Sequence, residues 1–295
     1  MSWQAGEATT GRIERVVRSR LLSRFVRDPV AMAGAGFIAL LVVVAILAPW
    51  LAPHSPTANF PKINGGPSAH HWLGTDDIGR DILSRLMFGA RISLEVSITV
   101  VLLALVVSLP IGLAAGYLGG ATDNLLMRLV DAMFAFPPLL FAITVAALLG
   151  KSLHNEIVAI SATFVPGFAR VIRGQVLTVR EETFIEASRS VGAGPLRMMT
   201  RHVLPNVASP LIVQAALALG YALLADAGLS FLGLGAQPPA PSWAGMLQEA
   251  YAYVLSNPWA TIVPGVAIAL TVLSFNLVGD GLRDALGRER VAGKA

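Results

Sequence analysis

Few side chains in this sequence could carry out chemistry, and their spacing matches no common catalytic pattern. Cysteine is absent, which excludes disulfides, thiolate metal sites and a cysteine nucleophile. Gly150-Lys151-Ser152 has the form of the end of a phosphate-binding loop. That pattern requires a glycine five residues earlier, where Val145 stands, and it follows a strand, whereas an apolar helical run precedes it here. We therefore do not expect this chain to bind ATP.

Two further polar motifs lie between residues 70 and 81. His70-His71 is a metal-binding candidate, but no third ligand stands at a suitable spacing, so we interpret it as a surface pair. The run "TDDIGRD" lacks the glycine and the terminal glutamate of a calcium-binding loop. It is typical of a helix start with Thr75 as the N-cap. Apolar residues then recur at helical spacing up to a glycine that can end the helix: Ile78, Ile82, Leu86 and Gly89.

Four acidic residues stand near the ends of apolar runs: Glu95, Asp131, Asp226 and Asp280. An ion-coupled carrier favours carboxylates near the middle of the membrane, so this placement argues against that class. We also find no Ser/His/Asp group and no paired carboxylates, which argues against a membrane-embedded enzyme.

The composition predicts an integral membrane protein. Of 295 residues, 55% are hydrophobic and 14% are charged, and the mean hydropathy is +0.66. A soluble domain has about 25% charged residues, so a typical soluble enzyme, a disordered chain and a coiled coil are excluded. The net charge of +4 does not indicate nucleic-acid binding, because the basic residues cluster beside apolar segments.

Six apolar segments are long enough to cross a bilayer, which takes roughly 20 residues. The first is too long for a signal peptide and lacks a cleavage site. An uncharged run at 227–248 is rich in glycine and proline, so we expect a loop packed on protein at the membrane edge. The fold class is therefore all-α, polytopic, with six transmembrane helices. The expected spans are 29–53, 96–122, 132–150, 157–176, 203–225 and one within 250–279.

The basic residues orient these spans. Six spans place both termini on one side, and the segments on that side hold 17 of the 22 Lys and Arg residues, which predicts cytoplasmic termini. The expected division is a cytoplasmic arginine-rich tail (1–28), transmembrane helix 1 (29–53), an outer loop with an amphipathic helix (54–91), a core of five helices (92–284) and a cytoplasmic C-terminal tail (285–295).

The longest cytoplasmic loop, about residues 175–201, predicts two short helices around a glycine turn. Thr183 and Glu186 have the spacing of a capping box, Gly192 begins the turn, Pro195 suits the start of the second helix and Pro205 closes the segment. The pair either rests on lipid headgroups or docks a soluble partner. The expected apolar faces are Phe184, Ala187 and Val191 in the first helix and Leu196, Met199 and Val203 in the second.

The same loop resembles the EAA loop of ABC importer permeases. Glu186-Ala187-Ser188, Gly192 and Leu204-Pro205 match its spacing at every step. Two departures are Ser188, where alanine is usual, and His202, where isoleucine is usual; Asp226 likewise stands where the family more often has glutamate. Segments 71–94, 229–247 and 279–288 are similar to the C-type subunit of dipeptide, oligopeptide and nickel permeases, and the resemblance covers most of residues 25–290.

The resemblance implies a type I ABC importer permease fold and a transport subunit without its own ATPase site. It implies a second homologous permease forming a heterodimer, two cytoplasmic ABC ATPase subunits that bind ATP and magnesium, and a substrate-binding protein on the outer face. No cofactor, metal or nucleic acid is expected on this chain, which would span the bacterial plasma (inner) membrane among its lipids. The residues implied to couple the permease to an ATPase, within 175–205, are Glu186, Ala187, Ser188, Gly192, Leu204 and Pro205.

The substrate stays open at this point. Dipeptides lead, followed by longer oligopeptides and then by nickel or a nickel chelate. An ion-coupled secondary transporter is the rival class; it would leave the EAA-like loop unexplained, and the sequence shows no clear internal repeat of the kind common in such carriers.

Overall fold

Long apolar helices make up most of the molecule. The structure is a computed structural model that describes residues 23–292, with side chains described up to residue 286, so most of the expected arginine-rich tail and the end of the C-terminal tail lie outside it. The long helices are α2 (Pro29–Leu51), α3 (Ile82–Leu118), α4 (Gly120–Phe134), α5 (Pro138–Leu149), α6 (Leu153–Val179), α9 (Leu204–Phe231) and α11 (Pro258–Ala292). The short ones are α7 (Thr183–Ser190), α8 (Pro195–Arg197), the π-helix η1 (Met198–Val203), α10 (Trp243–Ala250) and the 3₁₀ turn η2 (Tyr251–Tyr253).

Six spans are confirmed when one of them is counted as a bent pair. Within the described residues, five helices are long and apolar enough to cross a membrane, and α4 with α5 forms the sixth span with a bend of 91°. The third span, expected at 132–150, is instead divided between α4, which begins at Gly120, and α5. Two adjacent prolines, Pro137 and Pro138, lie at the bend, and because proline has no backbone N–H to donate, α4 ends and α5 begins in a new direction.

The segment before the second span also differs from expectation. Asp81, not Thr75, caps the helix, because its carboxylate accepts from the Ser84 backbone N–H at 2.8 Å. The expected separate amphipathic helix is the first part of α3, which continues through Gly89. A Cβ at Gly89 would lie 2.9 Å from Trp243 Cδ1, so the glycine lets Trp243 pack against α3 instead of ending the helix.

The core of the molecule is the crossing of α3 and α6. A Cβ at Gly112 would lie 2.6 Å from Ile172 Cβ, and one at Gly116 would lie 2.7 Å from Val176 Cβ. Ile172 and Val176 are fully buried there. Small residues at every fourth position allow this close approach of the two backbones.

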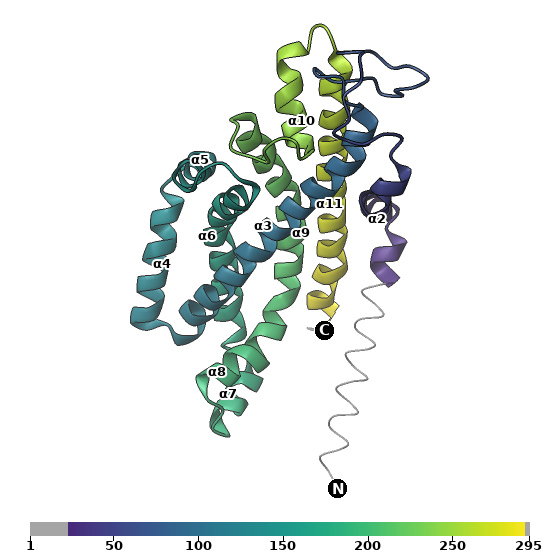
Figure 1. The fold of residues 1–295 in the computed structure, drawn as a ribbon. Helices are drawn as coiled ribbons and strands as arrows, with labels where there is room; N and C mark the ends of the chain where they lie inside the picture. The colour runs from purple at the N-terminus through teal and green to yellow at the C-terminus, as the bar shows by residue number, and fades with distance from the viewer. Residues whose placement is uncertain (1–22, 293–295) are drawn as a thin grey trace.

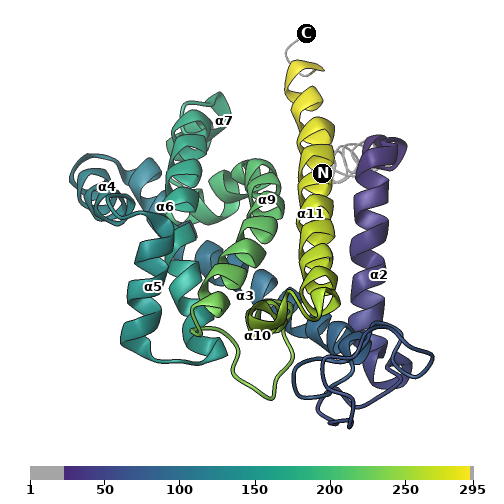
Figure 2. The same ribbon diagram turned by 90° about the horizontal axis from the view of Figure 1, so that it is seen from above.

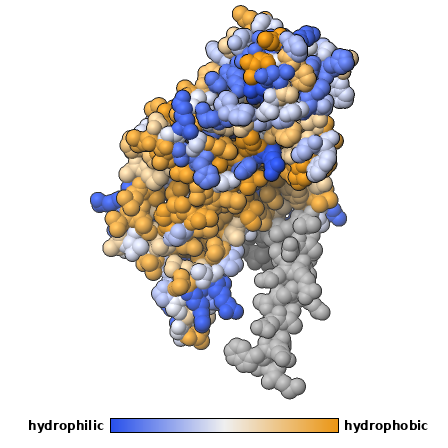
Figure 3. Space-filling model, viewed as in Figure 1, coloured by the Kyte–Doolittle hydropathy of each residue, from blue (hydrophilic) through white to orange (hydrophobic). Residues whose placement is uncertain are grey.

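The helices are arranged so that the two ends of the bundle have different features (Figure 1). One end carries α10 and the segment that joins α2 to α3, while α7 and α8 lie at the opposite end, together with the beginning of α2 and the end of α11. Figure 2 shows that α2 and α11 pack side by side at one edge. The space-filling view shows a mostly hydrophilic cap over the first end and a broad apolar band below it (Figure 3).

Candidate functional site

The segment from α7 to the start of α9 is anchored to the bundle by its buried side chains. Ile185 in α7 is fully buried and joins the main hydrophobic core, together with Met198 and Val203 of η1. Ile185 therefore fixes α7 against the helix that leads into α9.

The opposite face of α7 is apolar and exposed. Phe184 is 41% exposed and Val191 is 86% exposed, while Leu196 at the start of α8 is 71% exposed. Ala187 lies between Phe184 and Val191 on this face and is exposed too. The common face expected from the spacing in α7 is thus present, and it points away from the protein. Contiguous exposed apolar side chains of this kind mark a surface that contacts a partner or a membrane.

A glycine turn follows α7. Gly192 has φ of +82°, a conformation that L side chains rarely adopt, so the predicted role of this glycine in a sharp turn is confirmed. The Gly192 N–H donates to the Arg189 carbonyl at 3.0 Å and the Ala193 N–H donates to the Ser188 carbonyl at 3.2 Å, which closes the helix. The Ser188 hydroxyl donates to the Phe184 carbonyl at 2.8 Å, so serine fits in this position by bonding its own helix.

The expected capping box is wrong. Glu182 occupies the N-cap position of α7, and within the described residues no side chain makes a capping hydrogen bond there. Thr183 is already the first residue of the helix, one position too late to act as the cap. Glu186 is exposed in the first turn of α7, where a carboxylate is favoured by the helix dipole.

Leu204 and Pro205 begin α9, as predicted. The preceding turn is the π-helix Met198–Val203, which contains His202. Pro205 lacks the N–H that would continue the hydrogen-bond ladder, and a wide turn just before it accommodates that loss. The Asn206 side-chain amide donates to the His202 carbonyl at 2.7 Å, which adds a hydrogen bond at the junction of η1 and α9.

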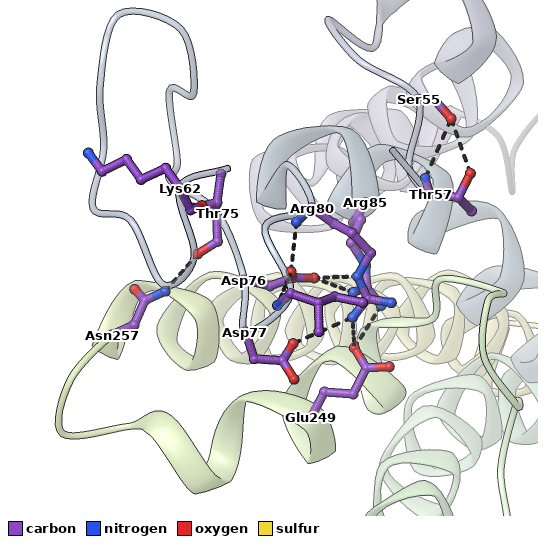
Figure 4. Close-up of polar contacts among 11 residues, drawn as sticks. Ser55, Thr57, Lys62, Thr75, Asp76, Asp77, Arg80, Arg85, Glu249 and Asn257 are labelled. Carbon is purple, nitrogen blue, oxygen red and sulfur yellow. Dashed lines mark hydrogen bonds and ion pairs between the residues drawn. The ribbon is translucent and has the colours of Figure 1, made fainter. Parts of the chain in front are cut away.

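At the other end of the bundle, charged side chains clamp the outer segment to α10 (Figure 4). Arg80 Nε donates to Asp76 Oδ2 at 2.6 Å, and its Nη2 donates to Glu249 Oε2 at 2.7 Å. Arg85 Nη2 lies 2.8 Å from Glu249 Oε2, and Arg85 Nη1 bonds Asp76. Both arginines are buried. The sequence did not reveal this clamp, because Glu249 is far from the others along the chain.

Asp77 sits at the edge of this clamp. Burial raises the pKa of its carboxyl, and the neighbouring Asp76 and Glu249 charges raise it further, while Arg80 partly opposes them. Arg80 Nη2 lies 3.6 Å from Asp77 Oδ1, which is at the limit of an ion pair.

Two carboxyl groups are buried together between α6 and α9. Glu156 is fully buried and Asp226 is 1% exposed. The Ser230 hydroxyl lies 3.4 Å from Glu156 Oε1 and 3.2 Å from Asp226 Oδ1. Asp226 stands near the end of α9 as expected, but the sequence did not indicate that it faces Glu156 in the first turn of α6.

These features define a multi-pass helical membrane protein with an exposed apolar face on a short helix at one end. The model of the binding-protein-dependent transport system inner membrane component matches residues 108–291, and the N-terminal TM domain of oligopeptide transport permease C matches residues 19–67. The chain belongs to this family of ABC importer permeases, which are transport subunits and not themselves ATPases.

Relatives and solved structures agree with this assignment. The chain is 45% identical over 265 residues to the glutathione transport system permease protein GsiD of Pectobacterium atrosepticum, covering 89% of this chain and 88% of that protein. It is 46% identical to the protein of the same name from Escherichia coli O6:K15:H31, with the same coverage. An inward-facing structure of the MetNI methionine ABC transporter matches with a TM-score of 0.57 and 20% identity, covering 69% of this chain and 97% of that one. This last match shows the type I importer permease fold.

Proposed function

We propose that this chain is the permease subunit of an importer for dipeptides, driven through the α7 segment by separate ATPases. One observation carries the coupling assignment: α7 exposes an apolar face while Ile185 ties it to the helix that leads into α9. A partner that grips this face and moves would move α9 with it. This is a two-state element that a distant site can bias.

The proposed coupling residues have distinct roles. Glu186 is exposed and available to a cationic or hydrogen-bonding group on the partner, and Ala187 leaves room for close contact. The Ser188 hydroxyl donates a hydrogen bond to a carbonyl of α7 itself, and Gly192 permits the turn that follows the helix. Leu204 and Pro205 start α9 and pass the movement into the membrane.

The proposed assembly follows from the family. This subunit pairs with a second homologous permease, two cytoplasmic ATPase subunits bind ATP and magnesium, and a substrate-binding protein delivers cargo on the outer face. The chain itself binds neither nucleotide nor magnesium. The charge asymmetry of the sequence supports cytoplasmic termini in a bacterial plasma membrane, and with that orientation α7, at the same end of the bundle, would be cytoplasmic too.

The substrate proposal is a short peptide, with dipeptides first. The relatives are named for glutathione, which is itself peptide-like and supports cargo of this size. Longer oligopeptides and nickel are the alternatives within the same family. An ion-coupled carrier would give the exposed α7 face no role.

The coupling proposal is tested by Gly192→Asp, with Gly194→Asp as the matched control. Gly192 has φ of +82°, whereas Gly194 has φ of −70°, and a Cβ at either position meets no described atom within 4 Å. We expect Gly192→Asp to abolish ATP-dependent uptake at normal membrane levels, and Gly194→Asp to retain most of it. Unchanged uptake by Gly192→Asp would disprove the coupling assignment.

The assembly and the cargo are tested by purification in mild detergent. We expect two ATPases and a second permease to co-purify, and the chain alone to show no ATPase activity. Calorimetry of the binding protein with dipeptides, longer peptides and nickel then distinguishes the substrates. Recovery of the chain alone under conditions that preserve such complexes would favour the ion-coupled carrier.

A further inference from the structure

Two histidines and an aspartate lie close together in the segment that connects α2 to α3. His54 follows the end of α2, His71 lies in the outer segment and Asp81 caps α3. One potential ligand atom from each of the three side chains lies within 4.8 Å of the other two. His71 is 9% exposed and Asp81 1% exposed, and the imidazole rings of His54 and His71 lie 5.0 Å apart between centroids. The expectation that His71 forms a surface pair with His70 was therefore wrong.

The hydrogen bonds to His54 and Asp81 resemble those that orient the ligand side chains of metal sites. His54 Nε2 lies 3.0 Å from the His70 carbonyl oxygen, which can only accept, so Nε2 donates this hydrogen bond and Nδ1 is the ring atom available to a metal ion. Asp81 Oδ2 accepts from both the backbone N–H and the hydroxyl of Ser84, at 2.8 and 2.7 Å. Asp81 Oδ1 is left to face His71 Nδ1 at 2.9 Å. A backbone carbonyl behind a histidine and hydrogen bonds behind a carboxylate fix ligand orientation in metal sites.

We propose that His54, His71 and Asp81 bind one divalent first-row transition ion of the zinc class. Two imidazoles and one carboxylate are a ligand set that zinc takes in proteins, with a water molecule in the fourth position. Imidazole also suits nickel and copper, whereas calcium and magnesium require oxygen ligands. Half-buried His54 leaves the site open to the outer solution.

The second acidic group nearby is a poorer site. Asp76, Asp77 and Glu249 also place ligand atoms within 4.8 Å of one another. Their charge is already met by the guanidinium groups of Arg80 and Arg85, so a cation there would have to displace a buried arginine. A transition ion is therefore expected at the histidine group and not at this one.

Metal binding at the histidine group would reinforce an existing junction between the end of α2 and the start of α3, where the His54 backbone N–H donates to Ser84 Oγ at 3.1 Å. His54 stands three residues beyond α2, while Asp81 is the N-cap of α3. A shared ion would hold the outer end of α2 against the start of α3, and so would stabilise the folded arrangement by binding it selectively. This role requires neither a particular cargo nor ATPase coupling.

The full chain is purified with its co-purifying partners through a non-histidine affinity tag, which is then removed, and is treated with a chelator. Zn²⁺ binding is then measured in nanodiscs. We expect one saturable site per chain and a higher unfolding temperature with Zn²⁺. His54→Ala and His71→Ala should each weaken binding at least tenfold and remove the thermal shift, since even outer partners of metal ligands cost about 10–100-fold. His70→Ala is the matched control, because it keeps the backbone carbonyl that orients His54.

Each outcome of the Zn²⁺-binding experiment either supports or overturns the proposed metal site. Zn²⁺ X-ray absorption of the unsubstituted protein should show two imidazole ligands, which supplies a readout even if His71→Ala does not fold. No saturable binding, or equal binding by the unsubstituted chain and His54→Ala, would overturn the site. Equal loss in His70→Ala would assign binding to the surface histidines instead. Calcium binding of the same affinity would also overturn it. Failure of the coupling test would leave all of these results unaffected.

Discussion

Glu156 and Asp226 bury their carboxyl groups side by side between the first turn of α6 and the last turns of α9. Glu156 Oε2 and Asp226 Oδ2 are buried and have no hydrogen-bond partner among the described residues. The Ser230 hydroxyl lies within 3.4 Å of both carboxyl groups, so it bridges α6 and α9 at this point. Two neighbouring buried carboxylates repel each other strongly, so we expect the pair to share a proton.

Glu156→Gln should preserve this junction. The amide supplies the hydrogen that the pair otherwise takes from solution, so we expect an equal or higher unfolding temperature at pH 8. Glu156→Ala should instead destabilise the protein by about 1–3 kcal/mol, because it leaves buried Asp226 with fewer partners. Thermal unfolding in detergent followed by tryptophan fluorescence measures both. Equal losses in the two variants would contradict the shared proton.

The crossing of α3 and α6 tolerates no added volume. Gly112→Ala would place a Cβ 2.6 Å from Ile172 Cβ, and we expect a loss of about 1–3 kcal/mol from overpacking. Gly36→Ala in α2 is the control, since no described atom lies within 4 Å of its Cβ. That change should be neutral or stabilise the helix by about 0.5–1 kcal/mol. The unfolding midpoints of the two variants should shift in opposite directions, and a tolerated Gly112→Ala would refute the close contact.

Glu249→Gln should loosen the outer segment. The change removes the charge that both buried arginines share, and breaking a fully buried pair costs about 3–5 kcal/mol. We expect a smaller loss here, because the Glu249 side chain keeps 20% of its surface exposed. Arg170→Gln breaks an exposed pair with Asp131 and should cost less than about 1 kcal/mol. Proteolysis within residues 54–81 should rise only in Glu249→Gln, and protection equal to that of the unsubstituted protein would argue against the clamp.

Asp77 should make stability depend on pH in the mildly acidic range. Its pKa is raised in the folded state by burial and by Asp76 and Glu249, so the folded protein binds this proton more tightly than the unfolded chain does. The contribution to stability is complete below the unfolded pKa, about 4, and is lost as pH rises through the folded value. Asp77→Asn should therefore raise the unfolding temperature at pH 7 by more than at pH 4. A difference that is the same at both pH values would contradict this.

Much of the fold could be predicted from hydropathy alone, because a span needs only a long apolar run. The third span shows the limit of that approach. An apolar run does not show where a helix bends, and only the position of Pro137 and Pro138 indicates where the backbone loses its donors and turns. The start of α3 was misplaced for a related reason: Thr75 and Asp81 are both good caps, and tertiary contacts decide between them.

For the candidate site too, some features could be predicted from the sequence and others could not. Helical spacing was enough to place Phe184 and Val191 on one exposed face, and glycine chemistry was enough to predict the turn at Gly192. The partners of Arg80, His71 and Glu156 come from distant parts of the chain or across a loop, so no local pattern indicates them. His71, which the sequence suggested to be part of a surface pair, is buried.

All the residues of α7 are described by the structure, and Ile185 alone among them is buried. In the coupling role proposed above, α7 would act as a lever, and Ile185, which shares the main core with Met198 and Val203, would be its pivot. A partner that binds the exposed face does useful work on α9 only to the extent that this pivot is stiff. A looser side chain there would let the lever swing while the membrane helices stay still, and the partner's energy would be dissipated as local motion. Efficiency in this protein is thus a property of one packing contact, separate from how tightly the partner binds.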